Sequence, residues 1–246
     1  MKALKVIAEG LTTSFRYPHF MQGAQPTFRM PPPATIYGHV CSVLGDWFEP
    51  AGVGFAIHFR YRAEFQDLES THILAATTGR LSGTSLPKAL EGTVNPFQRG
   101  ILFRPRLVLY LNRPDWLEAF RQPRYPVVLG RSQDLFVYRE VDVVDLVEAE
   151  VAYFEHTLMP DDFVRRTGAG QVVLMPRFLD VHARRQPVFA RYLILQRRVY
   201  SRDFLRYEGE PPIRFWTDPS AADADGICLG LLFHSWVDGS GHPGLA

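Results

Sequence analysis

Cysteine and long apolar runs are scarce in this 246-residue chain. Its two cysteines, Cys41 and Cys228, are too few for a disulfide framework, which favours a reducing cytoplasm as the compartment. No run of about 18 apolar residues occurs, so no membrane-spanning helix is expected. The first residues, MKALKVIAEGL, are too short and too polar for a secretory signal. Hydrophobic residues still make up 46% of the chain, enough for a substantial core.

The motifs of several chemistries are also missing. The sequence contains no CxxC, no HExxH and no GxxxxGK[ST] phosphate loop. Two GxG stretches, GVGFA and TGAGQ, lack the third glycine of a dinucleotide site and are typical of turns. No metal and no cofactor are therefore expected.

Lysine is rare, and charge is distributed unevenly. Only 3 of the 27 basic residues are lysine, and a net charge of +1 argues against non-specific coating of nucleic acid. Residues 1–140 carry 16 basic and 11 acidic residues, whereas residues 141–160 carry five acids and no Lys or Arg. Arginine binds phosphate through a planar, two-pronged group. Genomic base composition explains the arginine preference equally well, so both explanations stay open.

Apolar periodicity gives an element order for the first 145 residues. An alternating strand covers residues 3–10, and a loop rich in proline and glycine follows over 10–32. Apolar residues then recur at helical spacing over 33–47, with Pro33 in the first helical turn, where a missing N–H costs nothing. A second alternating strand is expected over 52–65.

Residues 67–100 have a different composition, rich in Thr, Ser and Gly, and predict a protruding hairpin or flexible arm. A strand over 101–111, a short helix over 113–123 and strands over 125–130 and 134–146 follow. The order β, α, β, arm, β, α, β predicts an α+β, ferredoxin-like βαββαβ domain. Residues 146–246 form a second, β-rich region, with a strand near 170–181 and a strand or helix over 186–200.

The stretch from Gly10 to Gly45 carries a motif that extends beyond this pattern. GLTTSFRYPHF is followed by PTFRMPPPATIYGHVCSVLG, and together they resemble the N-terminal signature of the Cas-five family, the CRISPR-associated RAMP subunits of type I Cascade complexes. YPVVLGRSQDL, at 125–135, resembles a weaker family turn. The general appearance is closest to the type I-B branch. The positions that match the first motif are Gly10, Phe15, Arg16, Pro18, Pro32, Pro33, Thr35, Ile36, Gly38 and Gly45.

The resemblance implies a ferredoxin-like domain over 1–145 with a β-hairpin thumb near 67–100, and a variable region over 146–246. It also implies a non-catalytic subunit that binds and caps the 5′ handle of the CRISPR RNA. The implied partners are that RNA, a Cas-seven-type backbone subunit, a large Cas-eight-type subunit and, indirectly, target DNA, with no membrane partner.

Aromatic and basic residues near the motif are candidates for RNA contact, since single strands are bound by stacked bases and paired phosphates. Phe15 and Phe28 are further aromatic candidates, with a core position as the alternative. The RNA-binding candidates are Arg16, Tyr17, Arg29, Tyr37, Arg80, Lys88, Arg99, Arg104, Gly130, Arg131 and Ser132.

Two other functions remain open from the sequence. The type I-C branch of the family cuts precursor RNA without metal, using a Tyr on the first helix and an adjacent Lys-His pair. Tyr37 could match that Tyr, but none of the three lysines precedes a histidine, and His39, His58 and His72 are not required by spacing. A protein-interaction subunit with little RNA contact is the other alternative, and the acidic segment 141–160 suits it.

Overall fold

The computed structural model describes residues 1–20, 23–209 and 211–237. The protein is mostly β, with three sheets and a few short helices. The largest sheet has eight strands, with neighbours in the order β12-β13-β11-β4-β7-β1-β8 and with β17 also paired to β4. In the described part of the chain, no helix is long and apolar enough to cross a membrane.

Four strands from the first 145 residues form the middle and one edge of this sheet. They are β1 (Lys2–Gly10), β4 (Gly54–Arg60), β7 (Arg106–Leu111) and β8 (Phe136–Asp145). Each neighbouring pair is antiparallel, in the order β8-β1-β7-β4. One helical connection joins β1 to β4 and another joins β7 to β8, so the expected element order is present.

Helix α1 (Pro33–Leu44) begins at the proline run, as the sequence predicts. Pro33 occupies the first turn, where its missing N–H breaks no helical bond. The helix ends three residues before the expected Trp47 because Gly45 adopts a left-handed conformation (φ 86°), which terminates a helix. A short 3-10 turn (Pro114–Trp116) and α2 (Leu117–Arg121) form the second helical connection.

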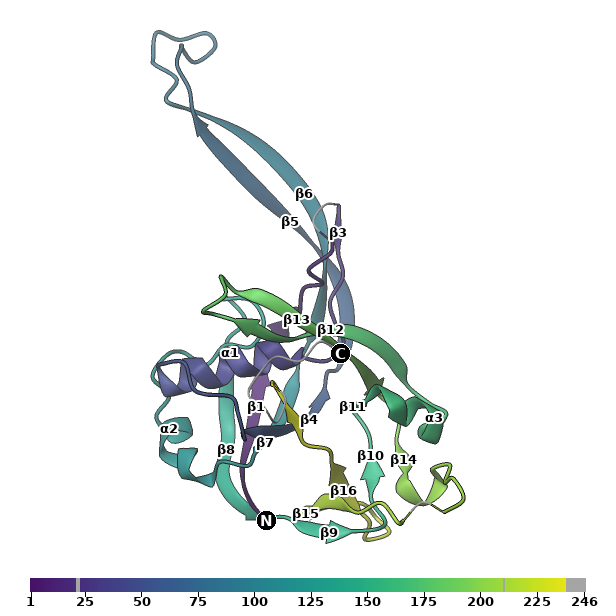
Figure 1. Ribbon diagram of the computed structural model, residues 1–246. Helices are drawn as coiled ribbons and strands as arrows, with labels where there is room; N and C mark the ends of the chain where they lie inside the picture. Colours follow the sequence, from purple (N-terminus) through teal and green to yellow (C-terminus); the bar gives the residue numbers. More distant parts are fainter. Residues whose placement is uncertain (21–22, 210, 238–246) are drawn as a thin grey trace.

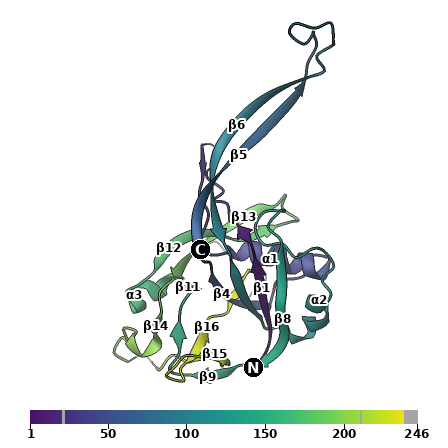
Figure 2. The ribbon, with the colours of Figure 1, turned by 180° about the vertical axis from the view of Figure 1, so that it is seen from behind.

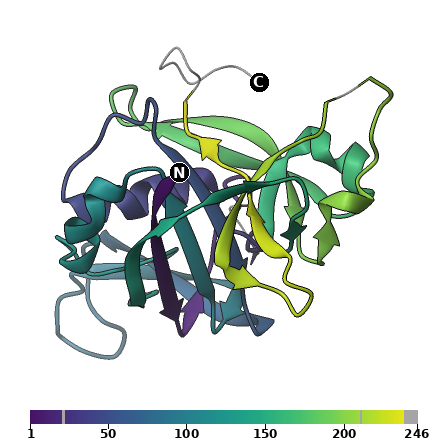
Figure 3. The same ribbon diagram turned by 90° about the horizontal axis from the view of Figure 1, so that it is seen from below.

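Both faces of the central sheet are covered, because side chains alternate between faces along each strand. Leu4 and Val6 of β1 pack toward α1 with Phe55 and Leu109. Ala3 and Ile7 point to the other face, where Leu229 is among their neighbours. That face meets a five-stranded sheet (Figure 3). The members of this sheet are β9 (Val147–Ala149), β10 (Tyr153–Phe154), β14 (Val199–Tyr200), β15 (Phe215–Ala222) and β16 (Cys228–Leu231).

A charged pair lies between these two sheets. Lys5 Nζ donates to Asp218 Oδ2 at 2.8 Å, and the two side chains are only 9% and 1% exposed. Tyr110 donates its hydroxyl to the same carboxylate, and Ser220 satisfies the other oxygen. Burial raises the pKa of Asp218, but the donors Lys5, Ser220 and Tyr110 outweigh it and hold that pKa below its ordinary value.

The region after residue 146 also extends the main sheet. β11 (Thr157–Pro160) and β17 (His234–Ser235) both pair with β4. On its other side, β11 pairs with β13 (Gln186–Leu195), which forms a hairpin with β12 (Gln171–Asp180). The segment left open between strand and helix is therefore the strand β13. A short helix, α3 (Val164–Thr167), follows β11. The two predicted regions thus share one sheet.

The expected arm is a long, regular hairpin, called the thumb below and defined as residues 63–103. It consists of β5 (Ala63–Ala76) and β6 (Leu90–Phe103), paired without a bulge from Ala63 opposite Phe103 to Ala76 opposite Leu90. It projects far beyond the body (Figures 1 and 2). At its base, β2 (Thr12–Thr13) and β3 (Ala24–Gln25) pair with β6.

Three predicted strands have different limits in the structure. The run over 52–65 divides into β4 and the start of β5, and the run over 101–111 divides into the end of β6 and β7. Pro105 causes the second break, because it lacks an N–H and Arg104 before it is left-handed (φ 49°). Residues 125–130 form no strand and contribute one bridge, between Val128 and Leu135.

The pair between Lys5 and Asp218 gives a stability prediction. Lys5→Met should lower the free energy of unfolding by about 3–5 kcal/mol, because it leaves a buried carboxylate without its cation. Lys5→Met combined with Asp218→Asn should recover much of that loss. Since the pKa of Asp218 is lowered in the folded chain, the loss should be full above the ordinary value of 3.8 and should shrink as the pH falls through the folded value.

Urea unfolding of the single and double variants at pH 7 and pH 3 measures both effects. A single variant as stable as the wild type at pH 7 would contradict this role for the pair.

Candidate nucleic-acid interface

A groove of about 460 Å³ lies beside the start of α1. Three segments that are distant in sequence form its walls with the β12–β13 hairpin: residues 16–18, residues 32–39 and residues 128–130. The walls are mostly apolar, and Arg16 supplies a cation at the rim. The structure therefore brings Arg16, the proline run and Gly130 together, as a shared site requires.

The helix start in this groove is suited to an anion. Pro32 is the N-cap and makes no side-chain cap bond, and the first turn of α1 holds no acidic residue. Pro32 and Pro33 have no N–H, and the Thr35 N–H donates to the Pro32 carbonyl at 2.8 Å, so an anion in the groove would meet the Ala34 N–H and the positive end of the helix dipole. Buried Trp236 fixes this end, since its indole N–H donates to the Pro33 carbonyl at 2.8 Å.

His39 connects α1 to the opposite wall. Its Nδ1 lies 2.9 Å from the Val128 carbonyl, and its Nε2 lies 2.8 Å from the Tyr138 hydroxyl. A carbonyl only accepts, so Nδ1 carries the proton and Tyr138 donates to Nε2. Burial lowers the pKa of His39, which keeps it in this neutral form. His39 is therefore a structural link and is not placed to act as a base.

The turn at 129–135 is organised by Asp134. Its buried carboxylate accepts from the backbone N–H of Arg131 at 2.9 Å, and from the Arg131 guanidinium through both oxygens. Thr12 donates to it as well. At Gly130 (φ 107°), a Cβ would lie 2.5 Å from Thr13 Oγ1, so only glycine fits there. The expectation that Gly130, Arg131 and Ser132 bind phosphate stays a prediction, and the contacts with Asp134 give Arg131 a structural role in this turn.

Glu69 of the thumb extends this network. Arg99 Nε donates to Glu69 Oε2 at 2.7 Å, and Arg131 Nη1 donates to Glu69 Oε1. The guanidinium of Arg99 also lies over the ring of Phe97. Arg99, like Arg131, is therefore part of the joint between thumb and body. The sequence predicted RNA contact for both, and it gave no signal that Glu69 would pair with Arg99, 30 residues away, and with Arg131, 62 residues away.

Most of the candidate aromatic residues are in the core. Phe15, Phe28 and Tyr37 are each less than 5% exposed. Tyr37 donates its hydroxyl to the Phe48 carbonyl at 2.7 Å, and burial is the largest cause of its raised pKa. Tyr17 is half-buried and stacks on Phe28, with 3.6 Å between ring centroids. Base stacking on Tyr37 stays a prediction that would require its ring to leave the core, and Tyr17 is the more exposed of the candidate aromatic residues.

The remaining candidates are spread over three regions, with Arg80 and Lys88 together near the thumb tip. Arg29 is half-exposed and pairs with Glu64 at 2.9 Å, which raises its pKa. Lys88 pairs with Glu91. Arg80 and Ser132 are exposed, Arg80 near the thumb tip and Ser132 in the Asp134 turn. Arg104 does not line the α1 groove and belongs to a second cleft.

The thumb is less basic and more apolar than its sequence suggested. It carries four carboxylates against two arginines and one lysine. Large apolar side chains nevertheless stand in solvent along its two strands: Phe65, Leu68, Ile73, Leu74, Leu90 and Val94. These apolar residues are spaced among Thr, Ser and Gly without a regular alternation, so the sequence pattern did not indicate an apolar surface. An exposed apolar surface of this kind is typical of protein contact.

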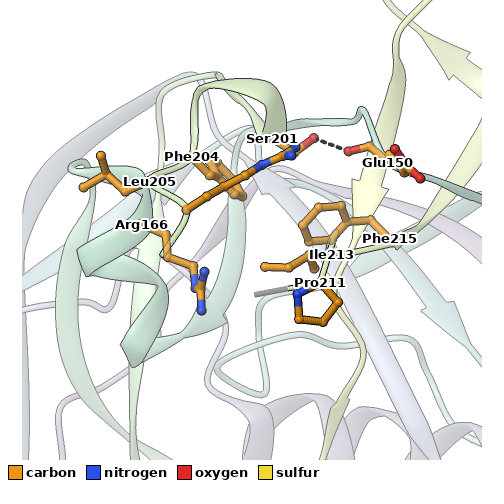
Figure 4. Close-up of a pocket in the computed structure, with 9 residues that line it drawn as sticks. Glu150, Arg166, Ser201, Phe204, Leu205, Pro211, Ile213 and Phe215 are labelled. Atoms are coloured by element: carbon orange, nitrogen blue, oxygen red, sulfur yellow. Dashed lines mark hydrogen bonds between the residues drawn. The ribbon is translucent and has the colours of Figure 1, made fainter. Parts of the chain in front are cut away.

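A small hollow in the C-terminal region is too small to be a ligand site. It is lined by Glu150, Arg166, Phe204 and Phe215, among others, and encloses only about 20 Å³, near the volume that one water needs (Figure 4). Ser201 donates to the Glu150 carbonyl at 2.8 Å and braces its wall. This hollow is a packing feature of the C-terminal core.

Comparisons with known proteins give loose structural likenesses. No protein-family model and no curated protein matches the chain in sequence. A chain of a CRISPR RNA-guided surveillance complex overlaps with a TM-score of 0.49 at 14% identity, over 80% of this chain and 89% of that one. A CRISPR protein from Archaeoglobus fulgidus overlaps with a TM-score of 0.49 at 10% identity, over 94% and 100%.

A chain of the Type III-B Cmr-beta complex bound to cognate target RNA and AMPPnP overlaps with a TM-score of 0.41 at 12% identity, over 80% and 84%. At these TM-scores and identities, the overlaps assign neither a family nor a function to this chain.

The joint between thumb and body gives a second stability prediction. Arg131→Ala should lower the free energy of unfolding by about 3–5 kcal/mol, because the fully buried Asp134 side chain loses its charged partner. Arg121→Ala is the matched control: it removes an exposed guanidinium from surface pairs with Glu118 and Asp142, and should change stability by less than about 1 kcal/mol. Urea unfolding measures both variants. A stable Arg131→Ala protein would contradict the structural assignment and return Arg131 to the RNA candidates.

Proposed function

We propose that this protein is a non-catalytic subunit of a type I CRISPR Cascade ribonucleoprotein and that it holds the 5′ handle of the CRISPR RNA. The observation that carries the proposal is the groove beside α1. The residues that resemble the Cas-five signature, Arg16, Pro18, Pro32, Thr35 and Gly38, are separated in the sequence and meet along this one groove.

The topology supports a ferredoxin-like RAMP domain over residues 1–145. The strand order β8-β1-β7-β4, with all neighbours antiparallel and helical connections between β1 and β4 and between β7 and β8, is that of a split βαβ domain. The thumb is inserted between β4 and β7. Arg131, which follows the groove residue Gly130, donates to Glu69 of the thumb, so an RNA strand that leaves the groove on this side would meet the thumb.

The chemistry of the groove supports single-stranded RNA as the ligand. A phosphate at the helix start would meet the Ala34 N–H and the Arg16 guanidinium, and the apolar walls offer contact to a base or ribose. Tyr17 is half-buried and lies between the groove residues Arg16 and Pro18 in the chain, so it stays a candidate for contact with a base. The groove volume of about 460 Å³ accommodates a nucleotide rather than a duplex, in keeping with an unpaired handle.

The thumb supports contact with a partner protein of the complex. Its exposed apolar side chains and lack of excess positive charge favour a backbone subunit of the Cas-seven type over a phosphate chain along its length. The acidic segment 141–160 is a candidate surface for the large Cas-eight-type subunit, and target DNA would be reached only through these partners. This apolar thumb is also what favours the alternative function, a protein-interaction subunit with little RNA contact.

The ribonuclease alternative is disfavoured by the surroundings of Tyr37. That hydroxyl is buried, donates to a backbone carbonyl and has a raised pKa, so it is a poor base for a ribose 2′-OH. His58 is partly enclosed, and burial lowers its pKa to about 4, with the neighbouring His156 as the next cause. His72 stands on the thumb, away from both.

Arg16→Ala should weaken binding of handle RNA about ten- to a hundred-fold, as expected for one charge-assisted contact of about 1.5–3 kcal/mol before solvent screening. The dependence of log Kd on log salt should fall by about one unit. Arg29→Ala should have a smaller effect, because Glu64 already neutralises Arg29. Arg121→Ala is the control and should bind as the wild type does.

Fluorescence anisotropy over a salt titration measures these effects, with melting curves and a gel of the RNA after incubation in EDTA. Unchanged affinity in Arg16→Ala would contradict handle binding in the groove. Site-specific cutting of the RNA in EDTA would favour the ribonuclease alternative.

A further inference from the structure

A second cleft, of about 600 Å³, lies at the thumb base on the opposite face of the central sheet. It is lined by the ends of β1, β4, β7 and β8, and by the Arg104–Pro105 corner where β6 passes into β7. Phe59 and Leu107 point toward α1, so their neighbours Arg60 and Arg106 point to the other face. This cleft, called the arginine cleft below, is therefore separate from the α1 groove.

The arginine cleft has an excess of positive charge. Arg60, Arg104, Arg106 and Arg139 line it together with a single carboxylate, Glu9. Glu9 accepts from Arg106 at 3.2 Å through one oxygen and from Arg139 at 3.0 Å through the other. Within residues 1–20, 23–209 and 211–237, no carboxylate lies within ion-pair distance of Arg60 or Arg104. Four guanidinium groups beside a single carboxylate leave an excess of positive charge, and a bound anion would relieve their mutual repulsion.

Arg104 is held in the cleft at a conformational cost. Its φ of 49° lies in the left-handed region, which glycine occupies more readily than a residue with a Cβ. Two backbone hydrogen bonds fix the corner: Arg104 N–H donates to the Leu11 carbonyl at 2.8 Å, and Gly10 N–H donates to the Pro105 carbonyl at 3.1 Å. The guanidinium extends over the ring of Phe103. A non-glycine residue retained in such a conformation is a sign of function.

The cleft also offers apolar contact. Leu11, Leu135 and Val137 line it and are 66%, 61% and 57% exposed. A ligand that carries regularly spaced negative charges and flat apolar surfaces matches both features, and a single strand of nucleic acid has this chemistry.

We propose that the arginine cleft binds the phosphodiester backbone of a second segment of single-stranded nucleic acid, independently of the α1 groove. The proposal deepens the proposed function, since it gives the subunit two strand-binding sites on opposite faces of one sheet. The strand is either another part of the guide RNA or a DNA strand, and both present the same phosphates.

Arg104→Gly provides a clean test. It removes the guanidinium and relieves the backbone, so the melting temperature should stay constant or rise. Binding of a twelve-nucleotide oligouridylate and of an oligothymidylate of the same length should weaken about ten-fold, the effect of one charge-assisted contact. Arg60→Ala should act in the same direction, and Arg121→Ala should bind as the wild type does. Comparing the two oligonucleotides shows whether the cleft prefers RNA or DNA.

The same measurements in the Arg16→Ala background separate this site from the α1 groove. A further loss of about ten-fold on adding Arg104→Gly supports two independent sites. Wild-type affinity of Arg104→Gly and Arg60→Ala for both oligonucleotides overturns the proposal, whatever Arg16→Ala does. Poly-glutamate that binds as tightly as the oligonucleotides, through the same arginines, also overturns it and assigns the cleft to an acidic protein surface.

Discussion

The position of the thumb depends on one carboxylate. Glu69 lies on β5 and accepts hydrogen bonds from Arg99 of the paired strand β6 and from Arg131 of the 129–135 turn. Arg131 is in turn held by the buried Asp134, which Thr12 of the N-terminal loop also contacts. A hairpin of 14-residue strands acts as a lever on its base, so these charge-assisted bonds, together with the pairing of β2 and β3 to β6, set the direction in which the hairpin projects.

The same network shapes the two candidate binding sites. The 129–135 turn forms one wall of the α1 groove. The N-terminal loop that supplies Arg16 is tied to this turn through Thr13, which donates to the Leu129 carbonyl, and to the thumb through Ser14, which donates to the Gly100 carbonyl. On the other face, the five-stranded sheet covers the central strands only toward one end. The row of arginines at the thumb end is left open. The thumb base is therefore where an otherwise doubly covered sheet becomes accessible to a ligand.

The sequence predicts the elements that local pattern determines. Pro33 sets the start of α1, alternation identifies β1 and β8, and the change of composition after residue 67 predicts a projecting hairpin. It does not predict contacts made across long stretches of chain. Glu69 reaches Arg131, Lys5 reaches Asp218, and β11 and β17 join β4, and nothing local in their sequences encodes these pairings.

In the candidate site, too, local pattern predicts some features, whereas contacts between distant residues are not predicted. The motif located Arg16 and the proline run, which do line one groove. Residue type alone could not separate Arg16 from Arg99 and Arg131, because the difference lies in position: Arg16 lines the groove, whereas Arg99 and Arg131 donate to Glu69 at the joint between thumb and body. Arg104 is a similar case: its left-handed backbone follows from the corner between β6 and β7, which the sequence presents as one uninterrupted strand.

The most direct measurement is a map of RNA contacts in the assembled particle. The tagged chain would be purified with its natural partners, irradiated with ultraviolet light and digested, and the crosslinked peptides and the 5′ ends of the bound RNA sequenced. The account predicts RNAs that share a constant, repeat-derived 5′ segment, crosslinked to peptides within residues 10–38. Bound RNA with unrelated 5′ ends, or crosslinks absent from residues 10–38, would contradict it.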